Sequence, residues 1–476
     1  MRQMADSRDT VTSDRPTPAG TVGSFTTTIK LKLRAPAKLR NRELLLLLFA
    51  IAINGAAIAL VQLGALGAID SGMLALGGGL ALLTLGIHFA LRFTAPEADP
   101  FILPIITLLN GLGIAMIYRI DVAKHLVGWE SVAVRQIVWT AMAMLIALGV
   151  ILIIRNHRVL ARYRYIAMFT GIVLLLLPML PGIGATKFGS RLWIEIGPFS
   201  FQPGELAKIA LAVFFAGYLV ESRDSLSMVG KKILGMRFPR GRDLGPILVI
   251  WAAAMVVLIF QRDLGTSLLY FGLFLVMIYV ATGRLSWVVL GLGLFVGGAL
   301  VASQVLSYVA SRFHGWLDAF NPDVYDKAGG SYQLVQGLFG LAHGGLIGTG
   351  FGQGRPQLVP LAESDYIIAS LGEELGLAGL FAILALYLLF VSRGMRIGFA
   401  GTDDFGRLLG VGLAFVIALQ VFIVLGGVTR LIPLTGLTTP FLAAGGSSLV
   451  ANWIIAALLL RLSDTVRNQP RLVVEG

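Results

Sequence analysis

Two charged side chains lie in an apolar stretch where water is not expected. Glu205 and Lys208 are three residues apart in a segment that follows an aromatic loop rich in glycine and proline. In a helix this spacing puts a carboxylate and an ammonium on one face, where they can pair. A charge inside an apolar span costs a few kcal/mol, so it marks a functional site by default. The residues leave two interpretations open: a buried ion pair that orients its helix, or a lysine that holds a phosphate as a compact charge.

Asp365 is the strongest candidate for acid–base chemistry. It ends a long loop and comes directly before an apolar segment that begins at Tyr366. A carboxylate at a membrane boundary is partly desolvated, which raises its pKa and makes it a better proton acceptor. The same position suits a helix N-cap, a role that Asp often takes. Glu373 and Glu374 follow inside the apolar segment, where contact with a helix terminus or a buried arginine would explain them without catalysis.

The composition predicts an all-α, polytopic bundle of transmembrane helices. Hydrophobic residues make up 56% of the chain and charged residues 13%, whereas soluble domains contain about 25% charged residues. The absence of cysteine excludes disulfides and thiolate chemistry, and the five histidines have no ligand-like spacing. We expect about twelve membrane spans, near residues 44–66, 71–92, 100–119, 134–154, 164–182, 203–221, 243–261, 264–282, 285–306, 366–392, 406–429 and 438–460.

The net charge of +12 indicates membrane topology rather than nucleic-acid binding, because Lys and Arg gather at the ends of the spans. They crowd the N-terminal tail and the loops 155–164 and 222–242, and the positive-inside rule places all three in the cytoplasm. The loops 183–202 and 307–365 then face outward. The chain accordingly divides into a disordered basic cytoplasmic tail, two N-terminal transmembrane helices, a transmembrane core and a cytoplasmic C-terminal tail, at residues 1–42, 43–98, 99–465 and 466–476.

Two irregular segments are expected to shape a site. The loop 307–365 is too long for a simple connector, and its amphipathic stretch Tyr332–His343 predicts a folded cap. The glycines between Gly344 and Gly354 would supply tight turns or a close approach of the backbone to a ligand. Prolines and glycines between residues 426 and 448 predict a broken helix, which at membrane depth must line the protein interior or a cavity. Asp263 is interpreted as the cap of a tight turn.

The motifs together resemble the SEDS family (shape, elongation, division and sporulation), which includes RodA and FtsW. The resemblance covers about residues 99–465 and makes this part a core of about ten spans. The two spans that precede it are similar to those of actinobacterial RodA-like members. The matching residues are Trp193, Gly197, Phe201-Gln-Pro203, Glu205, Lys208, Asp263-Leu-Gly-Thr266, Ser331-Tyr-Gln333, Asp365, Gly372-Glu-Glu-Leu-Gly376, Pro433-Leu-Thr-Gly436, Pro440-Phe441 and Gly445-Gly-Ser-Ser448.

This resemblance implies a peptidoglycan glycosyltransferase that polymerises lipid II, an undecaprenyl-pyrophosphate disaccharide-peptide, at the outer face of the plasma membrane. It also implies a class B penicillin-binding protein as the partner that crosslinks the product. Asp365 matches the essential Asp of the family, and Glu205 and Lys208 match its intramembrane pair. Several neighbours depart from the family pattern, among them Gly204, Arg262 and Tyr366, which leaves the pKa and contacts of Asp365 open.

The chemistry of the candidate residues agrees with glycosyl transfer. A base must deprotonate the acceptor hydroxyl, and cations must stabilise the departing pyrophosphate. Without an Asp-x-Asp sequence, a divalent cation would bind mainly through the phosphates of the substrate. The candidate set comprises Asp365 as the base and, for substrate binding, Lys187, Arg191, Trp193, Gln202, Glu205, Lys208, Arg312, Arg355, Ser447 and Ser448, with Arg430 as a further outer cation.

Two other functions suit the same sequence. A flippase for the same lipid would also use many spans, broken helices and buried charges, but we find no internal repeat and the charges cluster toward the outer side. A non-catalytic scaffold for the penicillin-binding protein is the second alternative. Labelled lipid II discriminates among the three, since it would be polymerised, only translocated, or left unchanged.

Overall fold

The structure is a computed structural model that describes residues 37–187, 189–197, 199–227, 232–233, 236–237, 245–327 and 329–468. The expected N-terminal tail up to residue 36, the C-terminal tail from residue 469 and most of the loop 222–242 lie outside the described residues. Helix α1 begins at Ala37, inside the segment that we expected to be a tail. Its first turns are held by Arg40, which pairs with Glu43 at 2.6 Å and also donates to the carbonyl oxygen of Ala98.

Long helices account for most of the described chain. The first seven α-helices, α1 to α7, cover Ala37–Leu66, Ser71–Thr94, Ile102–Ala123, Val132–Ile153, Arg158–Arg162, Arg164–Leu176 and Pro203–Ser227. Helices α8 to α13 cover Gly245–Gln261, Leu264–Thr282, Leu285–Val305, Ser307–Leu317, Pro322–Tyr325 and Tyr332–Gly344. Helices α14 to α16 cover Ile367–Phe399, Asp404–Val428 and Gly446–Arg467. Short 3-10 helices lie at Gly128–Glu130 (η1), Leu177–Met179 (η2) and Pro356–Leu358 (η4).

Ten of these helices are long and apolar enough to cross a membrane, which confirms a multi-pass membrane protein. The two further spans that we expected at residues 164–182 and 243–261 contain shorter apolar helices, at residues 164–179 and 248–261. The count of about twelve spans therefore stays a prediction. The last expected span begins later than its apolar pattern, because residues 438–445 are not helical and α16 starts at Gly446.

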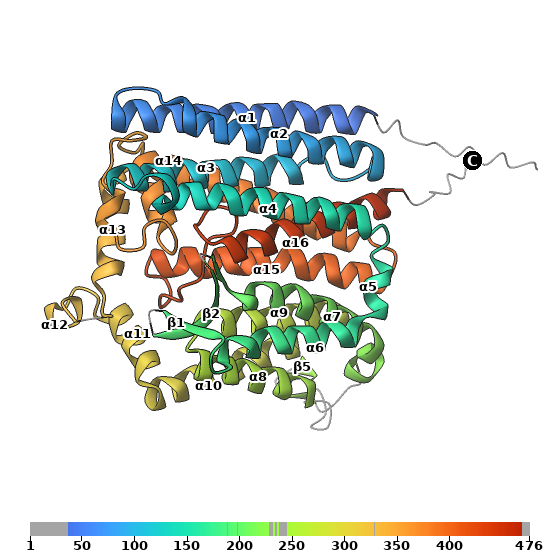
Figure 1. Cartoon of the computed structure of the whole chain (residues 1–476). Helices are drawn as coiled ribbons and strands as arrows, with labels where there is room; N and C mark the ends of the chain where they lie inside the picture. The colour runs from blue at the N-terminus through green and yellow to red at the C-terminus, as the bar shows by residue number, and fades with distance from the viewer. Residues whose placement is uncertain are drawn as a thin grey trace, which may run out of the picture. The chain divides into compact units, whose positions relative to one another are not determined.

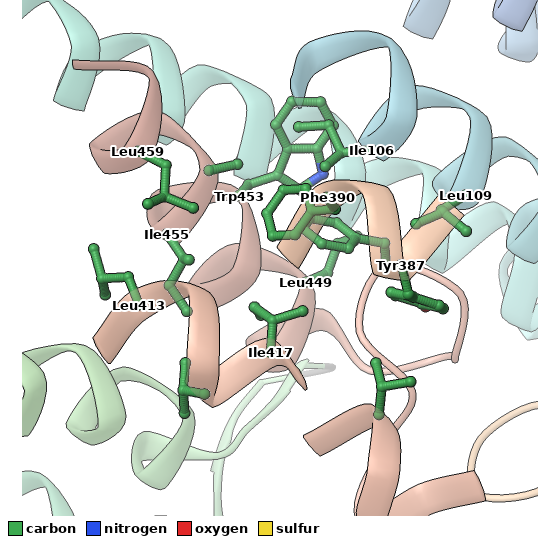
Figure 2. Packing of buried hydrophobic residues seen from close by; sticks show 14 of the residues in the cluster. Ile106, Leu109, Tyr387, Phe390, Leu413, Ile417, Leu449, Trp453, Ile455 and Leu459 are labelled. Carbon is green, nitrogen blue, oxygen red and sulfur yellow. The ribbon is translucent and has the colours of Figure 1, made fainter. Parts of the chain in front are cut away.

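The long helices lie side by side, and segments far apart in the sequence become neighbours. Helix α16 packs along α4, α1 packs along α3, and α15 contacts α7, α9 and α14 (Figure 1). The buried interior between α3, α14, α15 and α16 is filled by aromatic and branched aliphatic side chains, including Ile106, Phe390, Ile417 and Trp453 (Figure 2). Dispersion and close packing, rather than the hydrophobic effect, hold helices together where lipid replaces water.

Buried ionic contacts join several helices at the end of the bundle opposite the long loop. Asp99 accepts hydrogen bonds from Arg393 Nε at 2.9 Å and from Arg467 Nη2 at 2.7 Å. Arg461 donates to the carbonyl oxygens of Ile151 and of Thr94. The Asp99 contacts tie α14 and α16 to the segment that connects α2 with α3, and Arg461 ties α16 to α4 and to the end of α2.

The loop 307–365 is folded, as its amphipathic pattern predicted. It contains α11, α12, α13 and η4, and α13 packs against α14. Gly345, Gly348, Gly350 and Gly352 at its glycine-rich end have positive φ, which agrees with the expected tight turns, and this backbone also packs against α14. The expected close approach to a ligand stays a prediction. Leu377 N donates to Gly345 O at 3.0 Å, beside a kink in α14 where Gly376 has φ 67°.

Glu373 and Glu374 have the structural role that we expected as the alternative to catalysis. Glu374 accepts from Arg119 Nε and from Gly352 N, both at 3.0 Å. Glu373 accepts from Arg355 N at 2.8 Å and contacts His343 Nδ1 at 3.1 Å. The two carboxylates therefore hold the glycine-rich segment against α14.

The loop 183–202 contains a small antiparallel sheet that the all-α prediction did not include. Its strands β1, β2 and β3 cover Gly184–Lys187, Ser190–Ile196 and Phe199–Phe201, in the order β1-β2-β3. Gly189 and Gly197 have φ of 79° and 60° at the connections, a conformation that glycine adopts without strain. A further pair, β4 at Lys232–Ile233 and β5 at Met236–Arg237, lies in the loop that follows α7.

Candidate active site

A cavity of about 750 Å³ lies where the loops 183–202 and 307–365 meet the non-helical segment before α16. Its wall includes residues from the start of α4, from β2, from α11 and from the segment Leu434–Ser448. The prediction that residues 426–448 form a broken helix lining a cavity is confirmed, since α15 ends at Val428 and α16 begins at Gly446. Elements from four separate parts of the chain thus enclose one space.

Asp365 lies in this cavity rather than capping a helix. The N-cap of α14 is Tyr366, and no side chain caps this helix, so the capping alternative is wrong. The carboxylate faces the turn at Gly436, where an added Cβ would lie 3.7 Å from Asp365 Oδ2. Burial by the surrounding protein raises the pKa of Asp365 to about 6, although the positive charge of Arg312 and a hydrogen bond from Ser364 oppose the shift. Such a carboxylate is ionised at neutral pH and is a stronger base than an exposed one.

Four cations share the cavity with Asp365, and all are arginine or lysine. Arg312 of α11 donates from Nη1 to Leu434 O at 3.1 Å, which anchors its guanidinium beside the non-helical segment. The others are Arg135, Arg262 and Lys327. An excess of positive charge in a partly closed space favours an anionic ligand.

Asp263 caps α9, as the turn motif predicted. Its Oδ1 accepts from Thr266 N at 2.9 Å, and its other oxygen accepts from the hydroxyl of Thr266. Burial raises the pKa of this carboxyl, against the effect of these hydrogen bonds. Asp263 also lines the cavity, but both of its oxygens are engaged in capping the helix.

The predicted pairing of Glu205 with Lys208 is confirmed. Lys208 Nζ lies 2.7 Å from Glu205 Oε2, and both side chains are almost completely buried in α7. Neither residue belongs to the cavity wall. The pair lies behind the wall, because Lys208 also donates to Asn452 of α16, whose amide contacts Ser448 in the wall.

The structure brings about half of the other candidates together. Trp193, Gln202, Arg312, Ser447 and Ser448 line the cavity. Arg191 instead donates to Leu180 O at 3.4 Å, and Arg355 lies beside Glu373. The side chain of Lys187 lies outside the described residues.

Arg430 is not part of the cavity wall either, and its guanidinium donates to the carbonyl oxygens of Trp316 and Leu317. Sequence reasoning missed Arg135, Gln136, Trp139 and Lys327, which line the cavity from α4 and from the loop before α13. Arg135 and Trp139 are spaced i, i+4 near the start of a span, a spacing that indicates a shared face, but nothing in the sequence showed what this face contacts.

These features define a class of protein: a polytopic membrane protein with a polar, cationic cavity at one end of the helical bundle and a carboxylate of raised pKa in its wall. A family model described as a cell cycle protein, of the FtsW, RodA and SpoVE type, matches residues 100–468. The chain belongs to this family. The resemblance inferred from the motifs is therefore confirmed.

Named relatives extend the match beyond the core. The peptidoglycan glycosyltransferase RodA of Mycobacterium tuberculosis is 47% identical over 437 residues, which cover 91% of this chain and 92% of the relative. RodA of Mycobacterium leprae is 46% identical over 91% of this chain and 92% of its own length. The stage V sporulation protein E of Bacillus subtilis is 38% identical over 61% of this chain and 76% of its own length.

Solved structures agree with the fold. The rod shape determining protein RodA of Thermus thermophilus has a TM-score of 0.53 and 25% identity, covering 78% of this chain and 98% of its own. A chain from a peptidoglycan synthase complex that coordinates polymerisation and crosslinking has a TM-score of 0.51 and 24% identity, covering 84% of this chain and 99% of its own. At this identity the second likeness concerns the fold alone.

Proposed function

We propose that this protein is a peptidoglycan glycosyltransferase that polymerises lipid II into glycan strands for cell elongation and shape. The observation that carries the proposal is Asp365, a carboxylate with a pKa of about 6 in the wall of a cationic cavity of about 750 Å³. The mycobacterial relatives that match over 91% of the chain are named peptidoglycan glycosyltransferases.

Asp365 acts in this proposal as the general base. It takes the proton from the acceptor hydroxyl while that oxygen forms a bond to the anomeric carbon of the donor sugar. The bond from the same carbon to the pyrophosphate oxygen breaks, and lipid pyrophosphate leaves with the electron pair. The raised pKa makes the carboxylate a better proton acceptor and still leaves it ionised near pH 7.

The cavity cations stabilise the departing pyrophosphate. Arg312 is the best placed, since its guanidinium donates to Leu434 O and Asp365 faces Gly436, two residues further along the same segment. Preorganised cations aimed at developing negative charge commonly contribute several kcal/mol to catalysis. The described part of the chain has no group of three His, Cys, Asp or Glu side chains suited to a metal ion, so a divalent cation used in the reaction would bind chiefly through the phosphates.

Purified protein supplied with labelled lipid II tests the proposal and its two alternatives. Glycan chains on a gel support the polymerase. Translocation of the label across the membrane of proteoliposomes without chain formation would identify a flippase. If neither activity is observed, the non-catalytic scaffold is supported.

The polymerisation rate is expected to depend on pH through Asp365. A general base must be ionised, so kcat/KM should fall about tenfold per pH unit below the pKa, which is about 6. The measurement is the initial rate at low lipid II concentration between about pH 4.5 and 8. A rate that stays constant down to about pH 5 would contradict the assignment of Asp365.

A class B penicillin-binding protein is the proposed partner. The chain of similar fold in a peptidoglycan synthase complex supports this at the level of architecture. Affinity purification of the tagged protein from its own host, followed by mass spectrometry, is expected to recover a class B transpeptidase. Recovery of other wall enzymes without such a transpeptidase would contradict the partner.

The proposed location is the bacterial plasma membrane, with both termini in the cytoplasm and the cavity on the outer face. Single cysteines can test this orientation without background, because the natural chain has none. Asp326 is exposed after α12, and Asn156 is exposed between α4 and α5, so the two test variants are Asp326→Cys and Asn156→Cys. In cells freed of outer barriers, an impermeant thiol reagent should label position 326 and not position 156. The reverse pattern would put Asp365 on the wrong side for wall synthesis.

A further inference from the structure

Lys208 is the centre of a buried hydrogen-bond network that ends at the cavity wall. In addition to its ion pair with Glu205, its ammonium donates to Gln420 Oε1 at 3.0 Å and to Asn452 Oδ1 at 2.9 Å. Gln420 and Asn452 have no exposed surface. Three acceptors from α7, α15 and α16 thus surround a single cation.

The lysine determines which way both amides point. An ammonium can only donate, so each amide must turn its oxygen toward Lys208 and its NH₂ group away. The NH₂ group of Gln420 donates to Thr438 O at 2.8 Å. The NH₂ group of Asn452 donates to Ser448 Oγ at 3.3 Å.

Two serines of the cavity wall, Ser447 and Ser448, use their hydroxyl oxygens as acceptors on the protein side. Ser448 accepts from Asn452, and Ser447 accepts from Gln202 N at 2.7 Å. Both serines line the cavity, and both are only 5% exposed. Within the part of the chain that the structure describes, neither hydroxyl donates to a protein acceptor. Their protons are therefore available to a ligand in the cavity.

The start of α16 adds further donors to the same surface. Its N-cap is Gly445, which contributes no capping side chain. The first N–H groups of a helix have no partner inside the helix, and the helix dipole favours negative charge there. Together with the two hydroxyls, they form a surface that offers hydrogen-bond donors to an anion.

We propose that Asn452 and Gln420 are positioning residues that, held by Lys208, direct the hydrogen-bond donors of this wall toward the pyrophosphate of a lipid-linked substrate. Asn452 acts by keeping Ser448 an acceptor on its buried side, so that the hydroxyl proton faces the cavity. Gln420 holds the backbone at Thr438, which lies against Gly445. This inference rests on the proposed function and assigns the pyrophosphate group to one wall of the same cavity.

Asn452→Asp tests the direction of the hydrogen bonds. The aspartate still accepts from Lys208, but it accepts from Ser448 as well and draws the hydroxyl proton away from the cavity. The probe is geranyl pyrophosphate, whose binding to the purified protein is measured at equilibrium. We expect its Kd to rise about tenfold, the typical loss of one hydrogen bond to a charged group. With lipid II, KM should rise more than kcat falls.

Variants at Ser448 separate positioning from a structural role. Ser448→Ala should weaken the binding of geranyl pyrophosphate by about the same factor. Ser448→Thr keeps a hydroxyl and should retain most of the affinity. In the Ser448→Ala background, Asn452→Asp should have no further effect, because the asparagine acts through that hydroxyl. The neutral variant Asn452→Ala repeats the comparison if the aspartate impairs folding.

Asn54→Ala is the matched control, because it removes a partly buried amide that donates to Thr107 O at 2.9 Å in α3, away from the cavity. It should leave the affinity for geranyl pyrophosphate unchanged. The proposal would be overturned if Ser448→Ala bound the probe with unaltered Kd. It would also be overturned if the Kd increases of the Asn452→Asp and Ser448→Ala variants multiplied in the double variant. The binding assay does not require turnover. A wild-type protein that binds the probe but makes no glycan would therefore refute the polymerase function, while the Kd values of the variants would still decide whether the hydrogen-bond network positions Ser448.

Discussion

Asp365→Asn is expected to abolish glycan polymerisation and to leave the fold intact. Asparagine has nearly the same shape but cannot take up a proton, and loss of a general base typically slows a reaction about 10²–10⁴-fold. The carboxylate does not cap α14, so no helix terminus depends on it. The measurement is the yield of glycan chains from labelled lipid II, compared at equal amounts of folded protein.

Glu363→Gln is the matched control for this experiment. Glu363 is two residues away and pairs with Lys124 at 2.9 Å, but it is not part of the cavity wall. A partly exposed ion pair contributes about 0–1 kcal/mol to stability, so its loss should change the rate only a few-fold. Long glycan chains from Asp365→Asn, or equal losses in both variants, would show that Asp365 is not the base.

Lys208→Met is expected to destabilise the protein and to reduce its activity. Removing one member of a buried ion pair leaves the other charge without compensation, at a cost of about 3–5 kcal/mol. Here the substitution also removes the donor to Gln420 and Asn452. The measurement is the thermal unfolding temperature in detergent, with polymerisation measured on the same preparation.

Two comparisons make the Lys208 result specific. Lys124→Met breaks an ion pair whose lysine is 34% exposed, and it should alter the unfolding temperature little. Combining Glu205→Gln with Lys208→Met removes both charges and should be less destabilised than Lys208→Met alone. Equal unfolding temperatures for Lys208→Met and the wild type would contradict a stabilising buried pair.

Much of the fold could be predicted because it depends on local pattern. Apolar runs of bilayer length predicted the helices, and the i, i+3 spacing of Glu205 and Lys208 predicted their contact. The turn residues around Asp263 predicted its cap, and the prolines and glycines after residue 426 predicted a broken helix. Each of these depends on residues close together in the chain.

The small sheet at residues 184–201 was missed because its strands are short and lie in a loop between two predicted spans, where a search for apolar runs of bilayer length shows no pattern. Among the four cavity cations, Arg312 was identified as a substrate-binding candidate and Arg135, Arg262 and Lys327 were not. Arg191 and Arg430 were included although their guanidinium groups are directed to backbone carbonyls. A cation near the end of a span has many available partners, and the sequence does not show which one it contacts.

By itself, the sequence determined that this is a multi-pass helical membrane protein, that Glu205 and Lys208 share a helix face, and that Asp365 stands at the start of a span. The tertiary structure alone decided that Asp365 shares a cavity with Arg135, Arg312 and Lys327, and that Lys208 lies behind its wall. The physical reason is the sequence separation of the residues that interact. Helix formation and pairing within a helix depend on neighbours a few residues away, whereas the cavity forms only when α4, α11 and the segment before α16 pack together from distant parts of the chain.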